Sequence, residues 1–350
     1  MATRKLRPAF KVGETTIHAG ARATVDLPVS ILSDHTPVTM SMHVVHGRRP
    51  GPVIFISAAV HGDEVIGVEI VRRLLRTPAI DRISGTLLVV PIVNSFGFIN
   101  HSRYLPDRRD LNRSFPGSPH GSLAARLAHL FMTEIVARSE CGIDLHSAAI
   151  QRTNLPQVRV SEGNDKTMAM AKAFGAPVIL TSNVREGSLR AAAEAVGVNV
   201  LLYEAGEGLR FDEAGVRAGV AGILRVLHAK GMVSSRGISK AKVHPLACTS
   251  SHWERAPVGG LFRAFHSSGA HVEEGTMLGV VSDPFGEIEE EIRARSAGII
   301  VGRTNMPIVN EGDALIHIAQ VPSKVDGGAR VEALTEQLED DPLFGEDEII

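Results

Sequence analysis

Short apolar runs alternate with amphipathic segments along residues 53–231, and this alternation restricts the fold more than any other feature of the chain. Val53–Val60 and Thr86–Val93 are nearly continuous apolar runs, which is typical of strands covered on both faces. Glu64–Arg76, between them, places apolar residues at helical spacing. Strands that alternate with helices in this way predict an α/β fold whose sheet is covered on both faces.

The same alternation continues through the rest of this region. Further strands are expected at four short apolar segments: Cys141–His146, Gln157–Val160, Val178–Leu180 and Val198–Glu204. Further helices are expected at four amphipathic segments: Ser122–Arg138, Asp165–Phe174, Ser188–Val196 and Asp212–Lys230. A strand-like alternation over residues 38–46 begins the region, so we place the main domain at residues 38–231 and treat residues 1–37 as an N-terminal arm.

The pattern changes after Gly231. Short β-like pieces separated by Gly, Pro and Asn extend over residues 247–320, and the stretches 256–262 and 294–300 loosely repeat each other. This half-repeat is similar to the small β-sandwich of biotinyl and lipoyl carrier domains, but no lysine that could carry the group occurs between Lys242 and Lys324. We therefore expect a smaller β-sandwich-like domain with a structural or substrate-shaping role.

Charge is balanced along the chain except at its end. The 37 Lys and Arg against 39 Asp and Glu leave a formal net charge of -2, so nucleic acid is not expected as a partner. Residues 332–350 carry many acids, and we expect a disordered tail there, with docking onto a partner as the alternative. No secretory signal is visible, and no run approaches the ~18–20 apolar residues that span a membrane. Two distant cysteines form no disulfide or zinc framework, which favours a reduced, cytoplasmic setting.

A group of polar residues follows the first apolar run: His61, Gly62, Asp63 and Glu64. Ligand sites of open α/β sheets lie beyond the carboxyl ends of the strands, which is where this group falls. His61 and Glu64 are three residues apart, and Gly62 relieves the backbone, so both side chains could meet at one metal ion. Alternatively, Asp63 or Glu64 caps the following helix and binds no metal.

Asp144 and His146 end the strand expected at residues 141–146. Alternation along a strand places both side chains on one face. A single buried histidine is usually satisfied by hydrogen bonds alone. Together with His61 and Glu64, however, His146 completes a set of two imidazoles and one carboxylate, which a catalytic zinc needs while one position stays open for water.

Polar and basic residues are concentrated between residues 103 and 117. The arginines of this stretch are Arg103, Arg108, Arg109 and Arg113. Arginines beside a metal can hold a substrate carboxylate through two parallel hydrogen bonds or stabilise an oxyanion. The alternative is a solvated loop with surface ion pairs, which we favour for Arg108 and leave open for Arg109.

Glu204 closes the last buried strand expected in the main domain, after its apolar part Val198–Leu202. An acid at the end of a buried strand is well placed to act as general base on a metal-activated water. Glu207 could serve instead or face solvent. The position relative to the strand favours Glu204.

These motifs occur in the order found in a known family. They are His61-Gly62-Asp63-Glu64, Arg103 with Asp110-Leu111-Asn112-Arg113, Asp144-Leu145-His146 and Glu204-Ala205-Gly206. With them the chain resembles, over residues 38–320, the succinylglutamate desuccinylase/aspartoacylase family, relatives of the carboxypeptidase A-like zinc hydrolases. The resemblance implies a zinc-carboxypeptidase-like mixed α/β sheet with helices on both faces, followed by the smaller β-sandwich-like C-terminal domain.

The resemblance also implies a role for each residue. The residues implied as ligands of one zinc ion (Zn2+) per chain are His61, Glu64 and His146. Glu204 would be the base and later the proton donor, and Arg103 would be the carbonyl or oxyanion partner. Asn112 and Arg113 would bind the substrate carboxylate.

The implied activity is zinc-dependent hydrolysis of the amide bond of an N-acyl amino acid. The expected partner is a small anionic substrate, either an N-acyl amino acid or a peptide. Two alternatives stay open: carboxypeptidase-like release of a C-terminal acidic residue from a peptide, and a non-catalytic zinc-binding protein. The motifs select neither the acyl group nor the oligomeric state, for which a homo-oligomer is one option.

Overall fold

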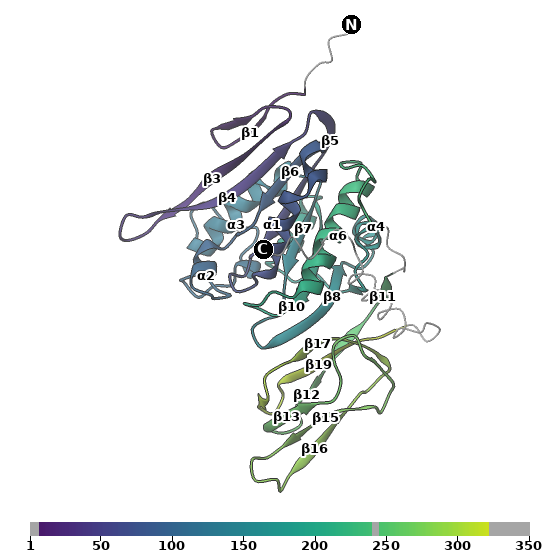
Figure 1. Ribbon diagram of the computed structural model, residues 1–350. Helices are drawn as coiled ribbons and strands as arrows, with labels where there is room; N and C mark the ends of the chain where they lie inside the picture. The colour runs from purple at the N-terminus through teal and green to yellow at the C-terminus, as the bar shows by residue number, and fades with distance from the viewer. Residues whose placement is uncertain (1–6, 240–244, 322–350) are drawn as a thin grey trace.

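The computed structural model describes residues 7–239 and 245–321 (Figure 1). These residues form a sheet of 13 strands, a four-stranded sheet and a two-stranded hairpin. The strands before residue 210 are β1 (Phe10–Val12), β2 (Thr15–Ile17), β3 (Ala21–Ile31), β4 (Pro37–His46), β5 (Arg49–Ala58), β6 (Ser84–Val90), β7 (Cys141–His146), β8 (Arg152–Val160), β9 (Val178–Thr181) and β10 (Asn199–Gly206). The helices are α1 (Ile66–Arg76), α2 (Ser95–Ile99), α3 (Leu123–Glu134), α4 (Asp165–Phe174), α5 (Leu189–Ala195) and α6 (Glu213–Ala229). Short 3-10 helices lie at Pro78–Arg82, Leu111–Arg113 and Val136–Arg138.

Parallel strands occupy the middle of the large sheet. β5 pairs in parallel with β6 on one side and with β7 on the other, and β7 pairs in parallel with β10. The carboxyl ends of β5, β7 and β10 therefore lie at the same end of the sheet. This is where ligand sites of open α/β sheets are found.

Helices cover both faces of the large sheet. Successive residues of β5 point to opposite faces of the sheet and pack in different cores. Ile56 packs in the core that contains α1, α4 and α6, whereas Phe55 packs in the core that contains α3 and α5. Both side chains are fully buried. The predicted α/β fold, with a mixed sheet and helices on both faces, is confirmed.

The predicted elements agree with the observed ones except near some ends. The strand at 141–146 and the helix at 165–174 match residue for residue. Helix α1 begins at Ile66 rather than at Glu64, so Glu64 lies in the loop that joins β5 to α1. The helix predicted over 122–138 ends at Glu134, and Val136–Arg138 form a separate 3-10 turn.

The segment interpreted as an N-terminal arm pairs with the large sheet. β1 and β2 form a hairpin, and β3 runs antiparallel to β4 along its length. Val25, Leu27 and Val29 are buried at alternate positions of β3, which is the pattern of an edge strand with one covered face. The domain boundary placed at residue 37 thus falls between two paired strands.

The C-terminal strands form two layers, which lie below β8 in Figure 1. β11 (Leu246–Cys248) precedes these layers and pairs in parallel with β9. The strands of the C-terminal region after it are β12 (Ser251–Arg255), β13 (Gly260–Ala264), β14 (His271–Val272), β15 (Met277–Ser282), β16 (Glu289–Arg293), β17 (Gly298–Thr304), β18 (Ile308–Val309) and β19 (Ala314–Ala319). The layer of β12, β19 and β17 continues the large sheet, because β17 pairs antiparallel with β8. The other layer contains β16, β15, β13 and β18, and an apolar core lies between the two.

Two further expectations concern the acidic tail and membrane-spanning segments. The acidic tail predicted at residues 332–350 lies outside them. Within residues 7–239 and 245–321, no helix is long and apolar enough to cross a membrane.

Candidate metal centre and active site

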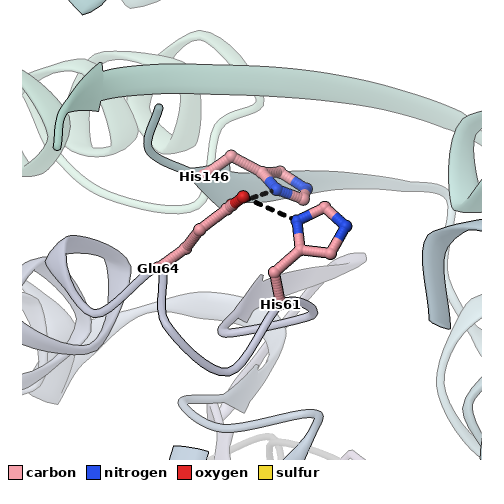
Figure 2. A group of neighbouring side chains, drawn as sticks. All are labelled: His61, Glu64 and His146. Carbon is pink, nitrogen blue, oxygen red and sulfur yellow. Dashed lines mark hydrogen bonds and ion pairs between the residues drawn. The ribbon is translucent and has the colours of Figure 1, made fainter. Parts of the chain in front are cut away.

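Two loops at the carboxyl ends of β5 and β7 bring the predicted metal ligands together. His61 and Glu64 lie in the loop between β5 and α1, and His146 is the last residue of β7. The parallel pairing of β5 with β7 places Ala58 beside Leu145, so both loops leave the sheet side by side. Figure 2 shows the Glu64 carboxylate pointing toward both imidazole rings, with a dashed line to a nitrogen of each.

The three side chains form a compact, buried group. Nδ1 of His61 lies 2.7 Å from Oε1 of Glu64, and Nδ1 of His146 lies 2.6 Å from Oε2 (Figure 2). One ligand atom from each residue lies within 4.8 Å of the others, and each residue is at most 3% exposed. His61, Glu64 and His146 could therefore hold one metal ion.

Two further carboxylates orient the imidazoles. Nε2 of His61 lies 3.1 Å from Asp110, and Nε2 of His146 lies 2.8 Å from Asp144. When a carboxylate accepts a hydrogen bond from Nε2–H, the ring proton stays on Nε2 and the lone pair is on Nδ1, which faces the shared centre. Strand alternation predicts that Asp144 lies on the same face as His146, but this supporting role was not predicted for either acid. For Asp110, no signal along the chain indicates the contact with His61.

The site is arranged to hold positive charge. Burial opposes ionisation of Glu64, but the rings of His61 and His146 hold its pKa far below the usual range. Burial also opposes protonation of His61, yet Glu64 and Asp110 outweigh it and raise the pKa of that imidazole. In the same way, Asp144 and Glu64 raise the pKa of His146 well above its ordinary value against the effect of burial. A divalent cation would supply the positive charge that these groups favour.

The capping interpretation of this loop is wrong. The N-cap residue of α1 is Val65, and no side chain donates or accepts a capping hydrogen bond there. Gly62 has a different role from the one expected, because its φ is not positive. A Cβ at Gly62 would lie 2.0 Å from the carbonyl carbon of Gly97, so glycine is needed for the close approach of two backbones.

The predicted substrate residues line the same cavity, which has a volume of about 570 Å³. Nη1 of Arg103 lies 3.1 Å from Oε1 of Glu64, and its Nη2 lies 3.1 Å from Asp110. Asn112 and Arg113 are at the 3-10 turn after Asp110, and Oδ1 of Asn112 accepts the N–H of Leu189 at the start of α5. All three predicted side chains therefore border the metal group's cavity.

Arg109, the arginine of the same loop whose role the sequence left open, lies outside this group. Arg109 pairs with Asp107 at 3.1 Å, and its side chain is 58% exposed. This contact is the surface ion pair that the alternative interpretation describes.

Glu204 lies at the end of β10, in register with His146 on the neighbouring strand β7. Its Oε2 accepts hydrogen bonds from Nδ2 of Asn154 (2.7 Å) and from Nη2 of Arg159 (2.8 Å). Glu204 lines the cavity. Glu207 instead accepts the backbone N–H of Gln151 and the amide of Asn305.

A second group of cavity residues was not predicted from the sequence. They come from β8, from α5 and the segment before it, and from C-terminal strands: Arg152, Asn154, Arg159, Arg185, Arg190, Trp253 and His317. The Trp253 and His317 rings stack with centroids 4.6 Å apart, so the C-terminal strands form part of the cavity wall. No local motif marks these residues. The pairing of β17 with β8 brings the C-terminal strands to the site.

Several known proteins are similar to this chain over most of its length. N-alpha-acetyl-L-2,4-diaminobutyric acid deacetylase from Halomonas elongata is 26% identical over 307 residues, which cover 84% of this chain and 90% of the relative. A succinylglutamate desuccinylase/aspartoacylase from Rhodobacter sphaeroides has a crystal structure that matches with a TM-score of 0.76 and 26% identity, covering 86% of this chain and 96% of that one.

A further structure shows the likeness of fold alone. It is the product-bound ectoine utilization protein EutE (DoeB) from Ruegeria pomeroyi, with a TM-score of 0.79 and 24% identity, covering 91% of this chain and 100% of that one.

Residues 50–229 match the model of the succinylglutamate desuccinylase/aspartoacylase catalytic domain, and this range contains every residue predicted for the site. The resemblance read from the motifs is thereby confirmed: the chain belongs to the succinylglutamate desuccinylase/aspartoacylase family.

Proposed function

We propose that this chain is a zinc-dependent hydrolase that cleaves the amide bond of a small anionic N-acyl amino acid. The observation that carries the proposal is the convergence of His61, Glu64 and His146 in one cavity with Glu204. Three metal ligands beside a separate carboxylate are the arrangement of catalytic rather than structural zinc sites.

The residues present fit a zinc ion. Two imidazole nitrogens and one carboxylate are ligands that zinc takes at catalytic sites, where a fourth position stays open. The outer nitrogens of both rings already contact Asp110 and Asp144, which is the usual support of zinc-bound histidines. When bound, zinc would act as a Lewis acid and lower the pKa of water to about 7.

The protein's own residues divide the remaining work. Glu204 takes the proton of the attacking water through Oε1, since Oε2 is occupied by Asn154 and Arg159. It then passes this proton to the departing amine. Arg103 donates to the oxyanion, and Asn112 and Arg113 bind the carboxylate of the amino acid.

Arg103→Ala is expected to lower kcat by ~100–1000-fold, as removal of one oxyanion donor typically does. Burial works against the charge of Arg103, but Glu64 and Asp110 raise its pKa, so the guanidinium stays charged beside the metal ligands. Steady-state kinetics with zinc-loaded protein measure the effect, and zinc content should stay unchanged. Arg109→Ala, a surface exchange in the same loop, is the matched control. A near-normal kcat for Arg103→Ala would remove this assignment.

Arg113→Lys is expected to raise KM by ~10–100-fold, the effect of losing a hydrogen bond to a charged group. A lysine ammonium keeps the charge but cannot form the planar two-point contact that a guanidinium makes with a carboxylate. We expect kcat to change little, because Arg113 touches the substrate away from the reacting amide. Measuring kcat and KM separately tests this, and an unchanged KM would argue against a carboxylate clamp.

Positive charge in the cavity supports an anionic substrate. Six arginines line it: Arg103, Arg113, Arg152, Arg159, Arg185 and Arg190. Nη1 of Arg190 is buried and has no hydrogen-bond partner among the described residues. Cations held in this way favour a ligand that brings a carboxylate. A cytoplasmic location and a homo-oligomer stay predictions.

A substrate panel tests the proposed function. Zinc-loaded protein is incubated with N-acetyl amino acids, N-succinyl amino acids and glutamyl peptides, and release of free amine is followed. We expect hydrolysis of at least one N-acyl amino acid. Release from the peptides alone would favour the carboxypeptidase alternative. Stoichiometric zinc without hydrolysis of any compound would favour a non-catalytic zinc-binding protein.

A further inference from the structure

The C-terminal strand β17 pairs with β8, the strand that carries Asn154, and Asn154 contacts the proposed base Glu204. Asn154 of β8 is in register with Gly206 of β10 on one side and with Gly302 of β17 on the other. It is 8% exposed, so its side chain is largely buried. Asn154 therefore connects the C-terminal layer to the strand that carries Glu204.

We propose that Asn154 positions the carboxylate of Glu204, and that the lack of a side chain at Gly302 leaves the space that this contact needs. The role rests on the proposed function, in which Glu204 moves the proton. Nδ2 of Asn154 donates to Oε2 of Glu204 at 2.7 Å. With Oε2 also bound by Arg159, the carboxylate is held in one orientation and Oε1 is the oxygen left for the proton.

Gly302 provides the space that this contact needs. A Cβ at position 302 would lie 2.6 Å from Oδ1 of Asn154, well inside van der Waals contact. The φ of Gly302 is not positive, so alanine would not strain the backbone there. Because the nearest atom is the end of a side chain, the carboxamide of Asn154 would have to move. The backbone oxygen of Thr153, at 3.3 Å from the new Cβ, would have to give by only a few tenths of an ångström. The C-terminal region thus supports catalysis because glycine at position 302 leaves room for the carboxamide of Asn154.

Gly302→Ala is expected to lower kcat by ~10-fold or more, since hydrogen bonds to a charged group are worth that much. Asn154→Ala should lower kcat to a similar extent. KM, zinc content and melting temperature should stay near those of the unmodified chain, and kcat is expressed per zinc-loaded chain. The two exchanges should not add, because Gly302→Ala acts only through Asn154. The double variant is therefore expected to match Asn154→Ala alone.

Asn305→Ala is the matched control. Asn305 also bridges the C-terminal region to the main body, but its amide contacts Glu207 (3.0 Å) and Thr153 (3.3 Å) rather than Glu204. It should leave kcat unchanged. A loss of kcat as large as that of Gly302→Ala would show that any weakening of this junction lowers activity and would overturn the specific role of Asn154.

Other outcomes separate this inference from the proposed function. Normal kcat in both Asn154→Ala and Gly302→Ala, with activity lost in Glu204→Gln, would overturn the positioning role and leave the function standing. Additive losses in the double variant would also overturn it, because the methyl group would then act by another route. Absence of hydrolysis by the unmodified chain across the panel would overturn the function and, with it, this role of Asn154.

Discussion

Glu204→Gln is expected to lower kcat by ~100–10,000-fold, the range that a positioned general acid–base group contributes. The exchange keeps the shape of the side chain, and the amide oxygen of glutamine can still accept the hydrogen bonds from Asn154 and Arg159. What disappears is a group that takes a proton from water and returns it to the amine. KM and zinc content should therefore stay close to those of the unmodified protein, as steady-state kinetics and elemental analysis would show.

The matched control for this exchange is Glu207→Gln. Glu207 is the other acid that the sequence offered, and it accepts hydrogen bonds from the Gln151 backbone and from Asn305 instead of lining the cavity wall with Glu204. We expect near-normal kcat. If Glu204→Gln keeps its activity and Glu207→Gln loses it, the base has been assigned to the wrong residue.

His146→Ala is expected to abolish stoichiometric zinc binding and, with it, hydrolysis. Loss of a residue that only supports a zinc ligand costs ~10–100-fold in affinity or activity, and removal of a ligand itself should cost more. The exchange also leaves Asp144, which is 1% exposed, with the Ser57 hydroxyl as its other hydrogen-bond partner. An imperfectly paired buried carboxylate destabilises a fold by ~1–3 kcal/mol, so the melting temperature should fall as well.

Elemental analysis after dialysis against zinc measures this result, and thermal melting shows that the variant is folded. His43→Ala is the control, because His43 lies on β4 and contacts Thr24 and Arg22 rather than the metal group. Treating the unmodified protein with a chelator should remove activity, and adding zinc should restore it. One zinc ion per chain retained in His146→Ala would contradict the ligand set.

The fold could be predicted where local pattern and tertiary burial agree. The run Val53–Val60 is apolar at successive positions because β5 has helices on both of its faces, and the sequence shows this directly. β3 was overlooked for the opposite reason, since only alternate residues such as Val25 and Leu27 face the core. An edge strand of this kind looks polar along the chain, and its pairing with β4 is not a local property.

The site could be predicted for residues that stand at the ends of buried strands. His61, His146 and Glu204 all follow or end such strands, and parallel pairing of β5, β7 and β10 places these ends side by side. Asp110 and Asn154 do not stand at the end of a buried strand that the sequence predicts. Asp110 reaches His61 from a loop, and Asn154 contributes through its position between β10 and β17. Their contacts depend on how separate segments pack.

The α/β fold and the order of the candidate site residues could be predicted from the sequence alone, because apolar periodicity and strand ends are properties of neighbouring residues. Only the tertiary structure decided that both imidazoles turn Nδ1 toward Glu64, and that the C-terminal strands form one wall of the cavity. The physical reason is distance along the chain. The pairing of β17 with β8 and the contact of Asp110 with His61 join segments whose own sequences carry no trace of the partner.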